Sequence, residues 1–162
     1  MKSLLLLRHA IALPATSALG DLERALSPAG RGQARAVGDY LLARNWVPQR
    51  VVCSTAARTR QTAEQVLDAL GAQPALVAID ALYNANLDDM LGALREQAAD
   101  ADRLLLVGHA PAVGELASAL CTRGGDLALY CEPATLIEVA LNITSWPDIA
   151  HHCGSLRLLM PA

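Results

Sequence analysis

A chain of 162 residues has the length of one ordinary domain, and 53% of its residues are hydrophobic against 18% charged. This composition is typical of a folded globular protein and argues against extended disorder. The formal net charge of −3 offers no broad basic field, so we expect neither nucleic acid nor an acidic membrane surface as a partner. We therefore expect a single domain over residues 1–162, in which a local group of cations holds any anionic substrate.

The sequence also indicates a cellular compartment. The apolar run at residues 4–7 reaches Arg8 and His9 too soon to form the core of a signal peptide. No apolar run approaches the roughly 20 residues of a membrane span. The four cysteines show no CxxC spacing, so neither a redox motif nor a zinc site is indicated. We expect a cytoplasmic protein without a cofactor.

The chain begins with a strand followed by a helix. Residues 4–7 form a short apolar run that ends in charge, which favours a strand buried on both faces. Ser27 and Pro28 are typical of an N-cap and a first helical residue, and apolar residues follow at helical spacing. This pattern predicts a helix of about four turns that ends near Arg44.

A second strand and helix follow directly. Residues 50–53 predict another buried strand. Ser54 or Thr55 can cap the next helix, which carries an apolar stripe and is closed by Gly71. The order of elements is so far strand, helix, strand, helix.

The same alternation continues beyond residue 75. Residues 76–79 predict a third strand, and Asn86 is a suitable cap for the helix after it. Residues 104–107 form the most apolar run of the chain and predict a fourth strand. Pro111 then begins another helix.

The last part of the chain has a different pattern. The Gly124-Gly125 pair breaks the alternation, and residues 135–141 and 155–159 predict two strands that pair antiparallel at or near a sheet edge. Alternating strands and helices imply a largely parallel sheet covered on both faces. We therefore predict an α/β fold of three layers, a helix-sheet-helix sandwich whose mostly parallel sheet ends in antiparallel C-terminal strands.

Chemistry-bearing residues follow the predicted strands. Arg8 and His9 end the first strand, Arg58 follows the second, Asp80 follows the third and His109 follows the fourth. In open α/β sheets, ligands bind outside the carboxyl ends of the strands. We therefore expect two arginines, two histidines and a carboxylate to meet at one rim of the sheet.

These residue types suit the transfer of a phosphoryl group. A planar guanidinium can grip a phosphate with two parallel hydrogen bonds, so Arg8 and Arg58 are the expected clamps. A neutral imidazole beside them can attack phosphorus directly and give a phosphohistidine that water later hydrolyses. One of His9 and His109 would then attack, while the other donates a hydrogen bond to the phosphoryl oxygens.

Other interpretations of these residues exist. Taken alone, an Arg-His pair after a strand is more often an exposed loop than a site. His151, His152 and Cys153 are residue types that bind metals, but adjacent histidines in a strand point to opposite faces. We therefore expect no metal there.

Several blocks together resemble the histidine phosphatase superfamily, which includes phosphoglycerate mutases and acid phosphatases. Residues 7–10 (LRHA) are similar to its Arg-His-Gly/Ala signature, and residues 54–63 (STAARTRQTA) to its Ser-x-x-x-Arg-x-x-Gln-Thr block. Residues 26–30 (LSPAG) and 107–109 (VGH) match as well, in the family's order over about residues 3–120. The short length and residues 21–27 (DLERALS) look most like SixA-type phosphohistidine phosphatases, whose substrate is a phosphorylated histidine on a signalling protein.

The resemblance implies a phosphoglycerate mutase-like fold and a set of roles. His9 would be the nucleophile, and Arg8, Arg58 and His109 would complete the phosphate pocket. Mutases and acid phosphatases of the family use an acidic residue after the third strand as proton donor. Asp80 is the nearest residue here, and Asp21 in the loop after the first strand is a rival.

Three functions remain open at this point. The first is a phosphatase that acts through phospho-His9 on a phosphohistidine-bearing protein, which fits the lack of a large insertion able to form a lid. The second is a broad phosphomonoesterase acting on small phosphate esters. The third is a module that binds phosphate without turning it over.

Overall fold

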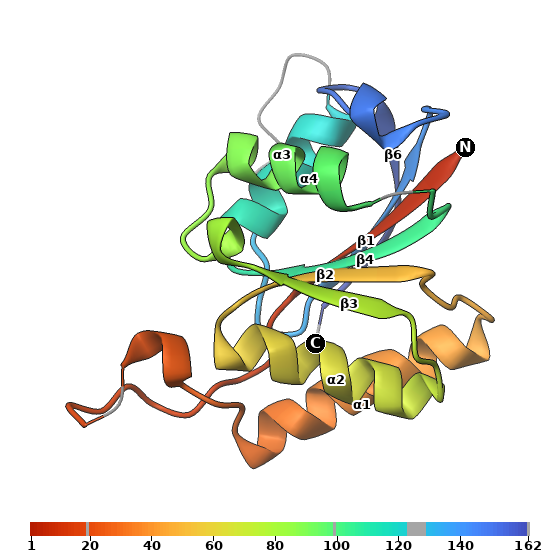
Figure 1. The fold of residues 1–162 in the computed structure, drawn as a ribbon. Helices are drawn as coiled ribbons and strands as arrows, with labels where there is room; N and C mark the ends of the chain where they lie inside the picture. The colour runs from red at the N-terminus through yellow and green to blue at the C-terminus, as the bar shows by residue number, and fades with distance from the viewer. Residues whose placement is uncertain (19, 99, 123–128, 162) are drawn as a thin grey trace.

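The computed structural model describes residues 1–18, 20–98, 100–122 and 129–161 (Figure 1). Its centre is one six-stranded sheet in the order β3-β2-β4-β1-β5-β6. β1, β2, β3 and β4 are parallel neighbours, whereas β5 runs antiparallel to β1 and β6 antiparallel to β5. The strands are β1 Lys2–Arg8, β2 Arg50–Ser54, β3 Ala75–Ile79, β4 Arg103–Gly108, β5 Leu136–Leu141 and β6 Gly154–Met160.

Helices cover both faces of this sheet. Figure 1 shows α1 (Pro28–Ala43) and α2 (Ala57–Leu70) below the sheet, and α3 (Leu87–Gln97) and α4 (Ala112–Cys121) above it. Three short 3₁₀ helices, η1 (Asp21–Glu23), η2 (Asp80–Leu82) and η3 (Trp146–Asp148), lie in the connections. The predicted three-layer α/β fold, with a mostly parallel sheet and antiparallel C-terminal strands, is confirmed.

The two faces of β1 pack into the two hydrophobic cores, one on each side of the sheet. Leu4 and Leu6 pack in the core under α3 and α4, and Leu5 and Leu7 in the core over α1 and α2. All four side chains are fully buried. Burying one leucine stabilises a fold by about 1.5–3 kcal/mol. These four leucines therefore fix the part of β1 that directly precedes Arg8.

Helix ends follow the predicted signals in most places. The Ser27 side chain accepts a hydrogen bond from the Gly30 N–H, Asn86 forms a capping box with Asp89, and Gly71 ends α2 with φ 62°. The expectation that Ser54 or Thr55 caps α2 is wrong. Ala56 holds that position without a side-chain cap, because β2 continues through Ser54. The predicted break at Gly124-Gly125 lies outside the described residues.

α1 and α2 touch closely at one point. A Cβ on Gly38 would lie 2.6 Å from the Ala69 Cβ and 2.6 Å from the Val66 carbonyl oxygen. The helices approach this closely because position 38 has no side chain.

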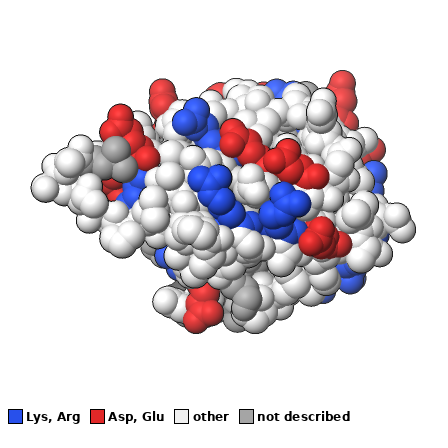
Figure 2. Space-filling model, turned by 90° about the horizontal axis from the view of Figure 1, so that it is seen from below, with Lys and Arg blue, Asp and Glu red and all other residues white. Residues whose placement is uncertain are grey.

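The outer face of this layer carries positive and negative side chains next to one another (Figure 2). Among the described residues, no helix has the length and apolar character needed to cross a membrane.

Candidate active site

The strand register brings the two predicted histidines together. Arg8 pairs with Gly108 across β1 and β4, and the His9 N–H donates to the Gly108 carbonyl at 3.0 Å. His9 and His109, which follow these two residues, have ring centroids 5.2 Å apart and planes inclined at 65°. Two residues separated by one hundred positions therefore meet at one edge of the sheet.

Hydrogen bonding fixes which nitrogen of His9 carries the proton. Its Nδ1 lies 2.8 Å from the Ala10 carbonyl oxygen. A carbonyl oxygen only accepts, so Nδ1 carries the hydrogen and Nε2 holds the lone pair of the neutral ring. The Ala10 N–H donates in turn to Thr62 Oγ1 at 3.1 Å, which ties this backbone segment to α2.

The surroundings of His9 keep its ring neutral. The residue is 8% exposed. Burial lowers the pKa of His9 to about 4, and the positive charges of Arg58, Arg8 and Arg24 act in the same direction. At neutral pH, His9 therefore presents an unprotonated Nε2 beside cationic side chains, which is the state that a nucleophile requires.

His109 is held by the last residue of β2. Its Nε2 lies 3.0 Å from Ser54 Oγ, which also accepts from the Ala56 N–H at 3.2 Å. The fully buried Ser54 hydroxyl needs an acceptor for its own hydrogen, and His109 Nε2 provides it. This arrangement places the His109 proton on Nδ1. Burial, followed by the charges of His9 and Arg58, lowers the pKa of His109 to about 4.

Both predicted clamps keep buried donors available. Arg58 is 5% exposed, and its Nη1 and Nη2 donate to the carbonyl oxygen and Oδ2 of Asp21 at 2.7 and 2.9 Å. Arg8 Nη1 donates to the Cys131 carbonyl at 2.6 Å. The Nε atoms of both arginines are buried and have no hydrogen-bond partner among the described residues, as is also true of Arg24 and Arg50. Because leaving such donors unpaired costs free energy, this pair suits an anion.

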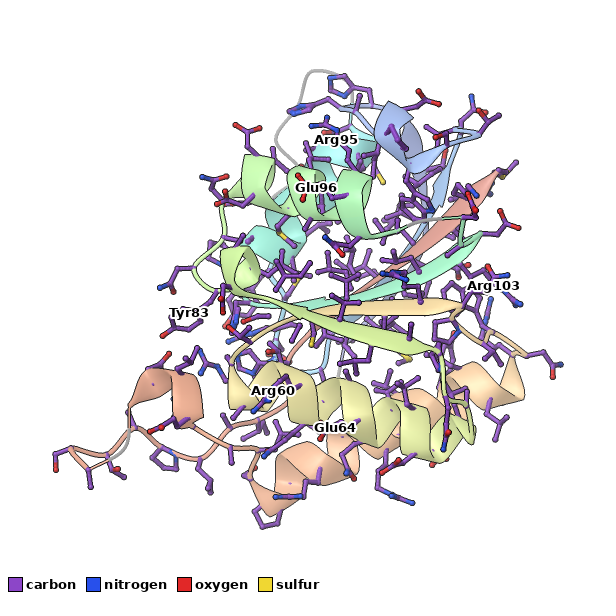
Figure 3. All side chains as sticks on the ribbon, in the orientation of Figure 1. Arg60, Glu64, Tyr83, Arg95, Glu96 and Arg103 are labelled. Atoms are coloured by element: carbon purple, nitrogen blue, oxygen red, sulfur yellow. The ribbon has the colours of Figure 1, made fainter. Side chains whose placement is uncertain are left out.

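Asp21 joins the site from the connection between β1 and α1. Its Oδ2 accepts from Tyr83 at 2.8 Å as well as from Arg58, and its Oδ1 lies 3.2 Å from Arg24 Nη2. Figure 3 labels Tyr83 at this edge, between the η2 turn and the η1 turn. The Tyr83 ring also meets the His109 ring edge-on, with centroids 5.9 Å apart. Asp21, the alternative proton donor, therefore contacts Arg58 directly.

Asp80 lies differently. It begins η2 and is exposed. Within the described part of the chain, no hydrogen bond or ion pair joins it to Arg8, Arg58 or either histidine. The structure thus brings His9, His109 and Arg58 together, with Arg8 directly before His9, whereas the described contacts do not link the Asp80 side chain to them.

The histidine pair near the C-terminus has a different geometry from the one expected. His151 and His152 lie in a turn before β6, not in a strand, and their ring centroids are 5.9 Å apart. In the described ranges, no group of three or more histidine, cysteine or acidic side chains could hold a metal ion.

A small hollow adjoins His109. Its volume is about 280 Å³, and Leu82, Met90 and Pro111 are among the residues that line it. Pockets for whole small-molecule ligands usually measure about 300–1,000 Å³. The hollow thus lies just below the lower end of the size range for pockets that hold a small molecule.

Sequence reasoning missed three contributors to this site. Ser54 was expected as a helix cap, and Tyr83 and Arg24 were given no role. A signal existed for Ser54, because it ends a buried strand beside the rim, as Arg8 does. Tyr83 and Arg24 lie in connections whose paths the hydrophobic pattern does not determine.

Comparison with known proteins agrees with this geometry. The model of the histidine phosphatase superfamily (branch 1) matches residues 4–128, which is more than half of the chain. The chain belongs to the histidine phosphatase superfamily. Its fold is that of the superfamily, and the match supports phosphatase activity.

Individual relatives cover nearly the whole chain. The uncharacterised protein Rv1276c of Mycobacterium tuberculosis is 32% identical over 145 residues, which cover 85% of this chain and 89% of that protein. Among solved structures, a candidate phosphohistidine phosphatase SixA from Agrobacterium tumefaciens superimposes with a TM-score of 0.81 at 26% identity, covering 99% of this chain and 98% of that one. A second, from Nakamurella multipartitia, gives 0.79 at 32% identity, covering 98% and 95%. The resemblance to SixA-type phosphatases is therefore confirmed.

Proposed function

We propose that this phosphatase removes phosphoryl groups from phosphohistidine on a signalling protein, through a phosphohistidine intermediate at His9. The observation that carries the proposal is the state of the His9 ring. Its Nδ1 donates to the Ala10 carbonyl, its Nε2 has no hydrogen-bond partner among the described residues, and the centroid of a second imidazole lies 5.2 Å away.

The proposed reaction has two displacements at phosphorus. His9 Nε2 attacks, its bond to phosphorus forms and the bond to the leaving group breaks, with the electron pair going to the leaving atom. Water then attacks phosphorus, the His9 Nε2–P bond breaks with its electron pair returning to Nε2, and phosphate leaves while the proton of the water passes to phosphate or solvent. Arg8 and Arg58 neutralise the equatorial oxygens throughout, which is the main way in which proteins accelerate phosphoryl transfer.

His109 would donate to the phosphoryl oxygens through Nδ1–H. Ser54 supports this role because its hydroxyl occupies Nε2 and so selects the tautomer with hydrogen on Nδ1. The low pKa of His109, about 4 because of burial, means that it acts as a neutral donor at physiological pH.

Two observations favour phosphohistidine on a protein over a small phosphate ester. Two solved structures at 26% and 32% identity to this chain carry the name SixA phosphohistidine phosphatase. The hollow beside His109, at about 280 Å³, is just below the usual range for whole small-molecule ligands, which is compatible with a phosphorylated side chain presented from a partner surface. The alternative substrate, a small phosphate ester, remains the second candidate.

An alkyl leaving group needs a proton donor. Asp80, the residue that sequence reasoning favoured, is exposed and keeps that role only as a prediction. If it protonates the leaving group, Asp80→Asn will lower the turnover of alkyl phosphates, which need an acid, more than that of p-nitrophenyl phosphate, which does not. Cytoplasmic location likewise stays a prediction.

The activity is tested by comparing two substrates. We expect a phosphohistidine-bearing protein to be turned over with a higher kcat/KM than p-nitrophenyl phosphate. The reverse ranking would favour a small-ester phosphatase, and turnover of neither would favour a phosphate-binding module.

Arg58 tests the phosphate clamp. Loss of one anion-stabilising donor costs about 3 kcal/mol in transition-state stabilisation, so Arg58→Ala should reduce kcat/KM by roughly 150-fold. Arg58→Lys should recover only part of this, since an ammonium cannot form the planar double contact. Arg60→Ala removes an exposed arginine from the same helix and is the matched control.

A further inference from the structure

Asp21 has features that its use as a proton donor does not explain. It lies in η1, outside the strand ends, and its side chain is 47% exposed although it pairs with the 6% exposed side chain of Arg58. The hydrogen bond from Tyr83, with the contacts to Arg58 and Arg24, holds the pKa of the Asp21 carboxyl below its usual value. Asp21 is therefore ionised at neutral pH and has no proton to give.

The hydrogen bonds of its two oxygens are unequal. Oδ2 accepts from both Tyr83 and Arg58, which uses the two lone pairs of a carboxylate oxygen. Oδ1 makes an ion pair with Arg24 at 3.2 Å and accepts no hydrogen bond from any described residue. This carboxylate is thus fixed through one oxygen and keeps acceptor capacity on the other.

The guanidinium of Arg58 lies between the Asp21 carboxylate and the proposed phosphate position. Its outer edge, Nη1 and Nη2, holds Asp21, while its buried Nε has no described partner. A phosphoryl group bound at the Nε edge would lie one guanidinium away from the carboxylate. A leaving group on that phosphoryl group would then come within reach of Asp21, on the exposed side of the site.

We infer that Asp21 accepts a hydrogen bond from the leaving imidazole of the substrate and holds that ring in its protonated form. This inference rests on the proposed phosphohistidine activity. In a phosphohistidine, one ring nitrogen carries phosphorus and the other titrates in the neutral range. An anion at hydrogen-bond distance from that second nitrogen favours its N–H form.

The proton balance removes the need for a general acid. The His9 Nε2–P bond forms, the P–N bond of the substrate breaks, and its electron pair goes to the leaving nitrogen. The proton already present on the other ring nitrogen makes the product a neutral imidazole. An alkyl phosphate has no such nitrogen, so Asp21 would give selectivity for phosphohistidine over phosphate esters.

Asp21→Asn tests this role, since it keeps the size of the side chain and removes its charge. We expect the ratio of kcat/KM for phosphohistidine to kcat/KM for p-nitrophenyl phosphate to fall about tenfold or more, the usual cost of losing a hydrogen bond to a charged group. The loss should grow above neutral pH, where the free substrate loses its ring proton. Asp21→Glu, which restores the charge, should recover part of the ratio.

Glu23→Gln is the matched control, because Glu23 is an exposed carboxylate in the same 3₁₀ turn. It should leave both the ratio and its pH profile as in the wild type. An equal loss on both substrates in Asp21→Asn, with an unshifted pH profile, would overturn the inference and leave the phosphohistidine activity of the wild type intact. Failure of the wild type to hydrolyse phosphohistidine would instead overturn the proposed function, and this inference with it.

Discussion

The state of His9 makes a prediction about stability as well as catalysis. Burial lowers the pKa of this imidazole to about 4, whereas an unfolded chain keeps the ordinary value of 6.5. Between these values the unfolded state binds a proton that the native state does not. Stability is therefore fully retained above pH 6.5 and falls as the pH drops toward 4.

The size of the loss follows from the shift. Each pKa unit corresponds to about 1.36 kcal/mol, so at pH 5, about 1.5 units below the unfolded value, His9 costs roughly 2 kcal/mol of unfolding free energy. His9→Gln removes the titrating group. We expect the wild type to lose about 2 kcal/mol more than His9→Gln between pH 7 and pH 5.

Urea unfolding at pH 7 and pH 5 measures the unfolding free energies of the wild type and of His9→Gln. His151→Gln, which removes an exposed histidine, controls for the loss of an imidazole in general. An NMR titration of the folded protein gives the pKa of His9 directly. A native pKa at or above 6.5, or identical pH dependence in the wild type and His9→Gln, would refute the assignment of a buried neutral ring.

Three further predictions concern separate parts of the molecule. Ser54→Ala removes the hydroxyl that fixes the His109 tautomer and should lower kcat about tenfold, whereas Thr55→Ala should not; equal kinetics in the two variants would show that the tautomer is set otherwise. Gly38→Ala forces a methyl group into α2 and should cost about 1–3 kcal/mol of unfolding free energy, while Gly32→Ala, where a Cβ meets nothing within 4 Å, should be neutral or stabilising; denaturant unfolding checks this pair, and similar stabilities would contradict the tight contact. Because the proposed chemistry uses only side chains of the protein, EDTA should leave the activity unchanged, and inhibition reversed by a divalent cation would contradict the mechanism.

The sequence was most informative where burial decides the structure. The short apolar run at residues 4–7 favours a strand buried on both faces over a helix, and this placed Arg8 and His9 at the rim. The same reasoning located His109 after β4. Parallel strands end at one edge of a sheet, so we expected both histidines there, and their ring centroids lie 5.2 Å apart.

Sequence reasoning failed where polar contacts decide the structure. Serine is a common helix-capping residue, but the Ser54 hydroxyl is hydrogen-bonded to His109 instead. A local sequence pattern does not indicate a partner 55 residues away. Asp80 was slightly favoured over Asp21 as the acidic residue after the third strand, and its role as proton donor stays a prediction. The path of the connection from β1 to α1, which brings Asp21 to Arg58, depends on tertiary contacts that periodicity does not encode.

The chemical fate of the phosphoryl group tests the central claim most directly. A phosphohistidine-bearing protein would be mixed rapidly with the enzyme, the reaction quenched in base, in which phosphohistidine survives, and the enzyme digested for mass spectrometry. We predict one phosphoryl group on His9 that appears within the first turnover and is absent in His9→Ala. Turnover at the wild-type rate in His9→Ala, or a phosphoryl group on another residue, would contradict nucleophilic attack by His9.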